Sequence, residues 1–461
     1  MTFDTAHWQA RLDALREENH MPGLSLAVLA DGEIHELASG VLHRGIGNPV
    51  TTDAVFQVGS VTKIHTATLI MMLVDQGRLD LDAPVAEVLP DFRVADPEAT
   101  KTITVRMLLN HTSGLSGDHH IDTGRGDDAV AEYVRSCADL RQDCPPGIVV
   151  SYCQSGYIIL GRIIEVVTGQ TYDAALREML IEPLGLTHTV TLPEEVLRFP
   201  NAMSHLGQAG ALPEVAPAWN PLTRAQVPGG GGLCATAADI VRLAKLHLDG
   251  GVAPDGTRLL GEPIVAAMQQ REIEVPDKWT VSSDAWGLGW TLYDWNGAFG
   301  YGHDGSAIGQ HSYLRVAPEA GVIIVLHDNG GDTPFTHGHP IYHRLFSELL
   351  RDLAGIDMPE DFAPPAQPPR VDIAPYLGIY RRAGIKITIG DGPAGHTATY
   401  EFVDGMDGLA PPLHMELVPV TDTVFAGRAN AAESWLPVVF STLPDGSVYC
   451  YIGVRAAPKV A

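Results

Sequence analysis

A serine and a lysine three residues apart are the residues of this chain best placed to do chemistry. Ser60 and Lys63 open a run that reads as a helix as far as Asp75, with Gly77 placed to end it. Residues three apart lie on one face of a helix, about one turn from each other. The serine hydroxyl would then lie beside an amine that can take or relay its proton, an arrangement that can produce a nucleophile.

The composition of the same run indicates where the helix lies. Its apolar residues occur nearly all the way round, which is typical of a helix buried at the centre of a domain. Such a helix would be a rigid base for a site. The apolar residues are Val61, Ile64, Leu69, Ile70, Met71, Met72, Leu73 and Val74.

The overall composition is that of a globular protein. The chain has 461 residues, of which 45% are hydrophobic and 19% charged, and this length favours two or three domains. The formal net charge of −26 argues against nucleic acid and anionic membrane surfaces as partners, because both would repel it. Five scattered cysteines without a Cys-x-x-Cys motif predict neither a disulfide framework nor a zinc site.

The N-terminal residues predict a soluble, cytoplasmic protein. Trp8, Leu12 and Leu15 form one helical stripe among charged residues, and no basic segment followed by an apolar one resembles a secretion signal. The longest apolar stretches are too short to cross a bilayer. We therefore expect no membrane partner.

The pattern of elements predicts an α+β catalytic domain over residues 1–357. Two strand-like runs flank Asp31-Gly32 and read as a β-hairpin. Mostly helical sequence, expected as an inserted subdomain, occupies about 78–250, and strand patterns then return. We expect an antiparallel sheet flanked by helices. The clearest later elements are helices at 158–167 and 237–248 and strands at 288–293, 310–316 and 322–326.

A second unit is expected at the C-terminal end. Residues 358–370 hold five prolines and read as a semi-rigid linker. Short alternating runs follow over 371–461 and predict a small all-β barrel or sandwich.

A serine nucleophile needs a further base and an oxyanion site, and three stretches offer them. Residues 151–157, with Tyr152, precede an apolar helix. Residues 302–306 contain His303, and residues 109–115 lie between the first two sites in the chain.

With these stretches the chain resembles the penicillin-recognising serine enzymes, in particular the class C β-lactamase, serine D-peptidase and esterase branch. That family's pattern is Ser-x-x-Lys, then Tyr-x-Asn, then a Lys- or His-x-Gly triplet on a strand. The resemblance covers roughly residues 5–350 and includes several flanking motifs in the family's order. The segment 376–380 resembles the start of the lipocalin-like barrel that some D-aminopeptidase and esterase relatives carry. The flanking motifs are 21–25, 56–63, 79–85, 108–115, 157–165 and 182–186.

The resemblance implies a role for each matching residue. Ser60 would attack an ester or amide carbonyl and form an acyl-enzyme, with Tyr152 as general base. A phenolate at neutral pH requires the pKa of Tyr152 to fall by about three units, and Lys63 is the cation that could lower it. The backbone N–H groups of Ser60 and Ser306 would form the oxyanion hole.

Two departures from the family pattern bear on the substrate. Gln154 stands where the family has Asn, so its amide reaches one methylene further. His303 stands where many members have Lys, with Asp304 and Gly305 after it; a neutral histidine binds a carboxylate weakly, and Asp304 adds opposing charge. We expect Gln154, His303, Asp304 and Gly305 to contact a neutral ester, an amide or an amine, and β-lactams to be poor substrates.

Three functions remain open on this reading. A serine hydrolase of small-molecule esters or amides is the leading one. An acyltransferase would pass the same acyl group to an amine or alcohol in natural-product biosynthesis. A catalytically silent binding protein is the third, against which the intact Ser60, Lys63 and Tyr152 argue.

We expect neither a cofactor nor a metal. Histidines gather at His337, His339 and His343, but no His-Glu-x-x-His motif occurs. Trp286 and Trp290 either line an acyl pocket or pack in the core, and Cys153 reads as a small buried filler.

Overall fold

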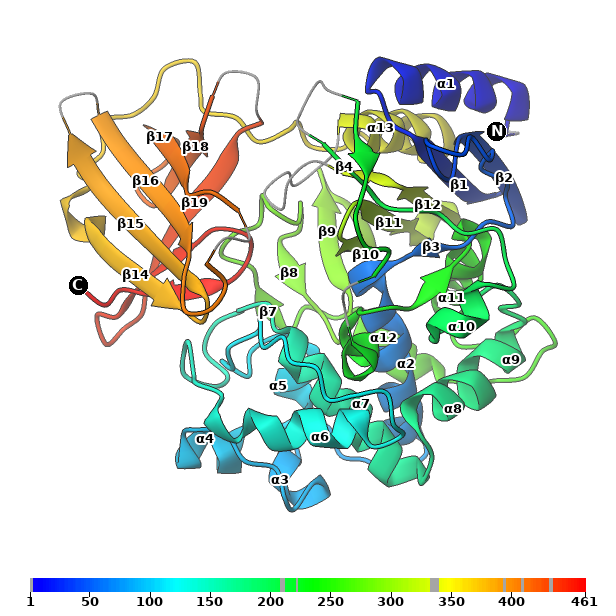
Figure 1. Cartoon of the computed structure of the whole chain (residues 1–461), viewed down its shortest axis with the longest axis horizontal. Coiled ribbons are helices and arrows are strands. Elements are labelled where there is room, and N and C mark those ends of the chain that lie inside the picture. The colour runs from blue at the N-terminus through cyan, green and yellow to red at the C-terminus, as the bar shows by residue number, and fades with distance from the viewer. Residues whose placement is uncertain are drawn as a thin grey trace.

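The structure, a computed structural model, describes residues 3–207, 212–220, 223–331, 340–392, 395–407, 410–430 and 434–461. Its larger part is built on an antiparallel sheet, which in the described residues has eight strands in the order β2-β1-β12-β11-β10-β9-β8-β7 (Figure 1). The sheet and the helices around it confirm the predicted α+β class. The strands are β1 (Gly23–Ala30), β2 (Glu33–Gly40), β7 (Ile273–Glu274), β8 (Ala285–Trp286), β9 (Thr291–Trp295), β10 (Ala298–Ala307), β11 (Gln310–Ala317) and β12 (Val322–Asp328).

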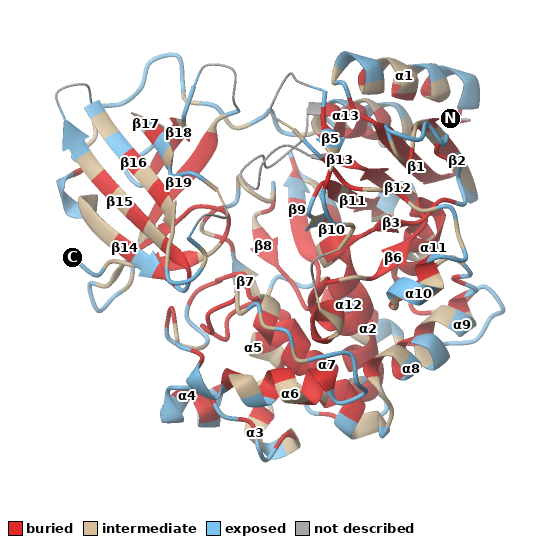
Figure 2. Ribbon diagram, viewed as in Figure 1, coloured by how far each residue is buried: buried red, intermediate tan, exposed pale blue. Residues whose placement is uncertain are grey.

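Helices cover both faces of this sheet. On one face lie α1 (Thr5–Glu18) and α13 (Pro340–Ala354), and on the other α2 (Thr62–Asp75) and α11 (Ala237–Leu248) (Figure 1). All eight residues of β1 are buried because both of its faces are covered. Figure 2 shows the same burial along the centre of the sheet and through α2.

Helix α2 is the central buried element that its composition predicts. Every residue from Thr62 to Leu73 is buried. Gly77 ends the helix in the left-handed region, with φ +66°. Its N–H donates to Val74 O at 2.9 Å, and the N–H of Arg78 donates to Leu73 O at 2.9 Å. These two bonds form a Schellman motif, so the end of α2 is fixed by the glycine expected there.

The other predicted elements lie close to their expected positions. The hairpin at Asp31-Gly32 pairs Ala30 with Glu33. Thr236 caps α11 by accepting from the N–H of Asp239 at 3.2 Å. The strand expected at 288–293 begins only at Thr291, because Gly289 at φ +92° forms a turn first.

Most of the segment between α2 and α11 is helix and loop, as predicted. Its helices are α3 (Val85–Val88), α4 (Pro97–Thr102), α5 (Val105–Leu109), α6 (Ala129–Ser136), α7 (Gln154–Thr168), α8 (Tyr172–Leu176), α9 (Glu182–Leu184) and α10 (Pro193–Val196), and α12 (Glu262–Met268) follows α11. Short strand pairs accompany them: β3 (Phe56–Gln57) with β6 (Cys234–Ala235), and β4 (His205–Leu206) with β5 (Glu214–Val215) and β13 (Gly330–Gly331).

The C-terminal unit is an antiparallel barrel of consecutive strands (Figure 1). It closes where the N–H of Ile379 donates to Ala461 O at 2.7 Å. Residues 355–373 carry neither helix nor strand, and we propose that the boundary between the units lies there. The strands are β14 (Gly378–Arg382), β15 (Ile385–Gly392), β16 (Gly395–Phe402), β17 (Leu413–Pro419), β18 (Val424–Arg428), β19 (Leu436–Thr442), β20 (Val448–Tyr451) and β21 (Ala456–Pro458).

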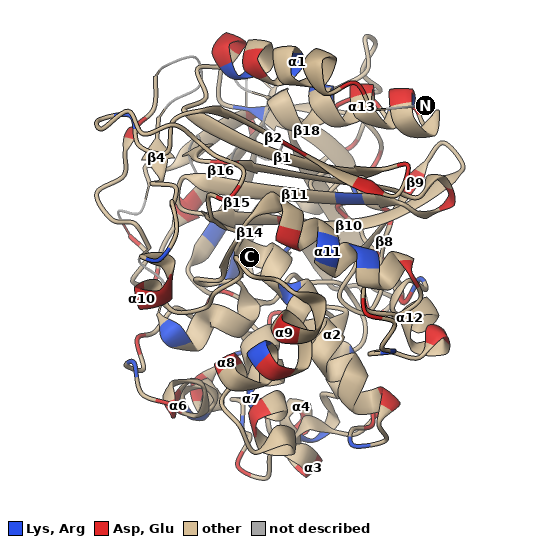
Figure 3. Cartoon of the chain, turned by 90° about the vertical axis from the view of Figure 1, so that its right-hand side faces the viewer, with Lys and Arg blue, Asp and Glu red and all other residues tan. Residues whose placement is uncertain are grey.

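The outer elements carry the excess of acidic residues. In this view Asp and Glu lie on α1, α9, α10 and other outer segments (Figure 3). Within the described ranges, no helix is both long and apolar enough to cross a membrane.

Candidate active site

Ser60 is held in a tight turn against strand β10. It lies in a 3-10 turn, Gly59–Val61, immediately before α2. Gly59 has φ +52°, and a Cβ on it would lie 2.5 Å from the backbone nitrogen of Ser306. A side chain at position 59 would therefore be strained and would push the strand away. The glycine lets the backbone of the nucleophile and that of β10 meet.

Lys63 lies one turn from Ser60 and is completely buried. Its Nζ is 3.1 Å from Ser60 Oγ and donates to Gln154 Oε1 at 2.7 Å. The backbone carbonyl of Gly229 is a third close partner. The sequence therefore places the amine beside the hydroxyl as predicted, and two groups from distant segments hold it there.

Burial shifts the protonation equilibrium of this amine toward the neutral form. It lowers the pKa of Lys63 well below its ordinary value, and the positive charge of Arg455 lowers it further. A neutral amine has two N–H donors and one lone pair. The carbonyl oxygens of Gly229 and Gln154 only accept, so they take the two donors. The lone pair of a neutral amine would then face the Ser60 hydroxyl 3.1 Å away, the geometry that a base for this nucleophile requires.

Tyr152 faces the same group from the segment that leads into α7. The centroid of its ring is 4.7 Å from Lys63 Nζ. Burial raises the pKa of Tyr152, while the Ser60 hydroxyl and Arg455 oppose the increase. Burial thus favours the protonated phenol, whereas the role implied by the family resemblance requires a phenolate.

The position of Tyr152 depends on the C-terminal unit, whose role the sequence left open. The N–H of Tyr152 donates to Val454 O at 3.0 Å, and the N–H of Ala456 donates to Ser151 Oγ at 3.1 Å. The guanidinium carbon of Arg455 is 5.1 Å from the centroid of the Tyr152 ring. A loop of the barrel therefore forms one wall of the site.

A buried carboxylate joins the two units beside this loop. Asp118 lies 3.0 Å from Arg455 Nε and 2.6 Å from a nitrogen of Arg382. Burial would raise the pKa of Asp118, but the two guanidinium groups lower it below its usual range. Asp118 is therefore charged and compensates part of the positive charge that the barrel brings to the site. Sequence motifs could not reveal the role of Asp118, because its partners are more than 260 residues away in the chain.

Strand β10 lies against the turn that carries Ser60, where the oxyanion hole is proposed. A Cβ on Gly305 would lie 2.0 Å from Val58 O and 2.8 Å from the nitrogen of Ser60. Gly305 thus lets the strand pass against the turn that carries the nucleophile. The next residue, Ser306, brings its backbone nitrogen near Gly59, so the two proposed oxyanion donors come from adjoining backbones.

His303 presents a hydrogen-bond acceptor at this site. Its Nδ1 is 2.6 Å from the carbonyl oxygen of Asp304. A carbonyl only accepts, so Nδ1 carries the proton and Nε2 holds a lone pair. Nε2 is buried and has no hydrogen-bond partner among the described residues. Burial lowers the pKa of His303 to about 3, so the ring stays neutral.

Asp304 points to the opposite face of the strand from His303, because side chains alternate along it. Its two oxygens are 2.5 and 3.0 Å from the guanidinium of Arg315. Arg315 is buried and lies between the rings of Tyr293 and Tyr342. The carboxylate is therefore compensated, and this geometry does not support the expected substrate contact of Asp304.

Cys153 and Trp286 are neighbours of the site. Cys153 caps α7 by accepting from the N–H of Gly156 at 3.2 Å, and burial raises its pKa to about 11, as expected of a structural thiol. Trp286 packs at a 61° angle against Tyr152, with ring centroids 5.8 Å apart, whereas Trp290 lies in the core.

The histidine cluster considered for a metal falls partly outside the described residues, since both His337 and His339 do. His343, which the structure describes, lies 2.9 Å from Pro359 O and 3.5 Å from Asp361. Among the residues that are described, no group of three His, Cys, Asp or Glu side chains could hold a metal.

Comparisons with known proteins agree with this geometry. A family model described as Beta-lactamase matches residues 8–346. Penicillin-binding protein 4 of Amycolatopsis lactamdurans is 58% identical over 385 residues, which cover 83% of this chain and 99% of that protein.

Two solved structures are similar as well. SurE with D-Leu has a TM-score of 0.75 at 27% identity and covers 99% of each chain. The D-amino acid amidase of Ochrobactrum anthropi SV3 complexed with L-phenylalanine amide has a TM-score of 0.63 at 26% identity, over 77% of this chain and 99% of that one.

A neutral, buried Lys63 predicts how stability depends on pH. The pKa of Lys63 is lowered in the folded protein and returns to about 10.4 on unfolding. Between these two values the unfolded chain binds one more proton, so this group makes the folded protein more stable as pH rises, by up to about 1.4 kcal/mol per pH unit. Lys63→Met lacks this contribution.

Thermal unfolding of the wild type and Lys63→Met between pH 6 and 9 measures it. The stability of the variant relative to the wild type should fall steadily as pH rises. Lys245→Met, on the partly exposed surface of α11, should run parallel to the wild type. Parallel curves for Lys63→Met would mean that Lys63 is charged in the folded protein.

Proposed function

The chain belongs to the beta-lactamase family and is a serine hydrolase of that superfamily, and we propose that it cleaves a small-molecule ester or amide bearing a hydrogen-bond donor near the scissile bond. The observation that carries the chemistry is the buried Lys63 amine, 3.1 Å from Ser60 Oγ. The observation that carries the substrate class is the unpartnered Nε2 of His303. The cytoplasmic location expected from the sequence stays a prediction.

The proposed acylation uses a neutral Lys63 amine and a protonated Tyr152 phenol. The lone pair of Lys63 takes the Ser60 proton as Oγ attacks the carbonyl carbon, and the negative charge develops on the carbonyl oxygen. The N–H groups of Ser60 and Ser306 stabilise that charge. Tyr152 then donates its phenolic proton to the leaving alcohol or amine, and Lys63 returns a proton to Tyr152. The products are the acyl-enzyme and the free leaving group.

Deacylation uses Lys63 as the base again. A water molecule loses its proton to Lys63 and attacks the acyl carbon, and the carboxylic acid leaves as Ser60 regains a proton. An amine that occupies the place of water would give a new amide by the same steps, which is the transferase alternative. Hydrolysis and transfer share every residue named here, so only the products distinguish them.

The hydrogen-bond acceptor on His303 favours amine-bearing or neutral substrates. A lysine at this strand position would present a cation to a substrate carboxylate, whereas Nε2 of His303 presents a lone pair. A substrate N–H, ammonium or hydroxyl satisfies a buried acceptor, and a carboxylate does not. Gln154 is half-buried at the same site, and its amide N–H₂ could donate to the substrate's acyl oxygen.

The relatives support this class without fixing the substrate. One similar structure is a D-amino acid amidase and another holds D-Leu, so amides and D-configured residues are the first compounds to test. Another relative is named a penicillin-binding protein, which makes penicillin a useful contrast. We expect penicillin to acylate this chain slowly, because it offers a carboxylate where His303 offers an acceptor.

Covalent labelling tests the nucleophile. A fluorophosphonate should add once to the wild type at Ser60, as measured by intact mass and peptide mapping. Ser60→Ala should not react, and Lys63→Met should react at least about a hundredfold more slowly, because it lacks the general base. Lys245→Met is the matched control and should react at the wild-type rate. A folded wild type that stays unlabelled would exclude the proposed function of Ser60 as a nucleophile.

Product analysis belongs to the same experiment. A p-nitrophenyl ester should yield free acid, and an added amine should yield amide only if the site also transfers. Free acid at every amine concentration would eliminate the transferase alternative.

Exchanging the strand residue tests the substrate class. His303→Lys should raise acylation by benzylpenicillin and lower hydrolysis of D-alanine p-nitroanilide, shifting the ratio of the two kcat/KM values by about tenfold or more. His303→Gln, which is neutral and can both donate and accept, is the control and should shift the ratio less. An unchanged ratio in His303→Lys would show that position 303 does not select the substrate.

A further inference from the structure

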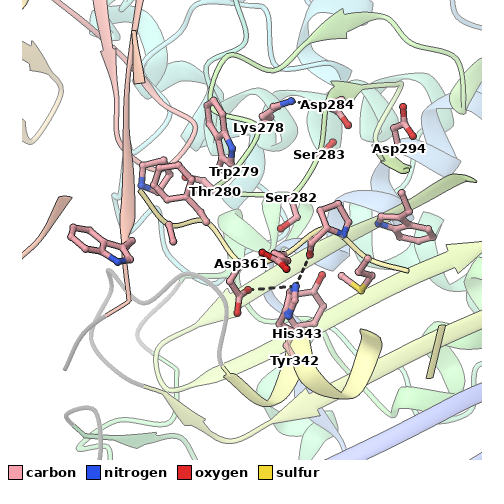
Figure 4. A pocket seen from close by; sticks show the side chains of 18 of the residues that line it. Lys278, Trp279, Thr280, Ser282, Ser283, Asp284, Asp294, Tyr342, His343 and Asp361 are labelled. Carbon is pink, nitrogen blue, oxygen red and sulfur yellow. Dashed lines mark hydrogen bonds and ion pairs between the residues drawn. The ribbon is translucent and has the colours of Figure 1, made fainter. Parts of the chain in front are cut away.

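A cavity that is separate from Ser60 lies between the catalytic unit and the barrel (Figure 4). Its volume is about 800 Å³. Its walls come from the segment before β8, the β9–β10 turn, the start of α13, the linker and the barrel strand β19. The lining residues are 278–280, 282–284, 294–297, 304, 313, 342–343, 358–363 and 434–437.

Strand β10 separates this cavity from Ser60. Asp304 lines the cavity, whereas the preceding residue, His303, packs near Tyr152 with ring centroids 6.3 Å apart. Successive side chains of a strand point to opposite faces. A ligand in the cavity would therefore lie behind the oxyanion strand, outside the catalytic site.

Aromatic side chains from both units line the space. Trp279 and Phe362 pack with their ring centroids 5.5 Å apart and remain partly exposed. Trp435 contributes from the barrel and is also partly exposed. Tyr342 lies at the other end and is stacked on Tyr313 at 4.5 Å. Exposed aromatic surface in a concave space of this size is typical of a small-molecule site.

The charges of the lining are mostly negative. Five carboxylates face one lysine, Lys278. Asp304 is compensated by Arg315, and Asp284 lies 3.3 Å from Lys278. The other three carboxylates, on Asp294, Glu360 and Asp361, are exposed at the rim. Their field attracts a cation into the cavity and repels a carboxylate.

The chain's own lysine shows that this wall holds a cation. Lys278 Nζ lies 5.6 Å from the centroid of the Trp279 ring and 3.3 Å from Asp284 (Figure 4). An aromatic face and a carboxylate thus already act together on one ammonium group. Aromatic rings bind ammonium groups through their negative faces, and the attraction grows when water is excluded.

We propose that this cavity binds an organic cation, an ammonium group carried on an apolar or aromatic body. The ammonium lies toward the carboxylates at the rim, and the apolar body packs against Trp279, Phe362 and Trp435. The cavity volume suits a ligand of ordinary drug size. The inference does not depend on the substrate proposed for Ser60.

Calorimetric titration of the full chain with phenethylammonium chloride tests it. Ser60 is first blocked with a fluorophosphonate, which occupies the catalytic site with a covalent group. We expect saturable binding of one ligand per chain. The matched anion 3-phenylpropionate should bind at least about tenfold more weakly, because the lining repels it.

Variants of the lining residues test whether phenethylammonium binds in this cavity. Trp279→Ala should weaken phenethylammonium binding about tenfold. The double variant Glu360→Gln/Asp361→Asn, which alters only exposed side chains, should weaken it severalfold. Glu319→Gln, an exposed acid in the turn before β12, is the control and should bind like the blocked wild type.

Three results would overturn the proposal. They are no saturable binding to the blocked full chain, equal binding of the anion, and unchanged binding in both Trp279→Ala and the double variant. Should Trp279→Ala fail to fold, the double variant alone decides the outcome.

Discussion

The removal of Lys63 from water is the constraint on which the rest of the site depends. Burying an ammonium group this completely is unfavourable, which lowers the pKa of Lys63 and favours the neutral amine that the proposed mechanism uses as a base. Burial requires every side of α2 near Lys63 to be covered, and all residues from Thr62 to Leu73 are buried. It also requires Gly229 and Gln154 to accept the two N–H groups, so that the lone pair is left for Ser60.

The same constraint explains why the barrel takes part in the site. A neutral Lys63 cannot stabilise a Tyr152 phenolate, so the tyrosine stays protonated and must be held by other contacts. Val454, at φ +57°, adopts a conformation that is unfavourable for a β-branched residue by about 1–3 kcal/mol. Its N–H donates to Asp277, and its carbonyl accepts from Tyr152. The barrel therefore shapes the wall of the site, and Arg455 and Asp118 set the charge there.

Local sequence patterns were sufficient to predict the elements of the catalytic unit. They were insufficient to predict the contacts between the two units. Ser60, Lys63 and the caps of α2 and α11 depend on residues three or four apart, and these elements appear where the patterns predict them. The role of Asp304 could not be predicted, because its partner Arg315 is on the neighbouring strand. The protonation of Tyr152 follows from burial, which only the packed structure reveals. The contribution of Arg455 depends on the docking of two units, which no short motif encodes.

Nitrogen NMR of the lysine side chains measures the central claim directly. The chain has six lysines, and the resonance that disappears in Lys63→Met identifies Lys63. Its Nζ should have the chemical shift of a neutral amine at pH 7 and should become an ammonium only at lower pH, while the other five remain charged. An Nζ of Lys63 that is an ammonium at pH 7 and loses its proton near pH 10 would contradict the account.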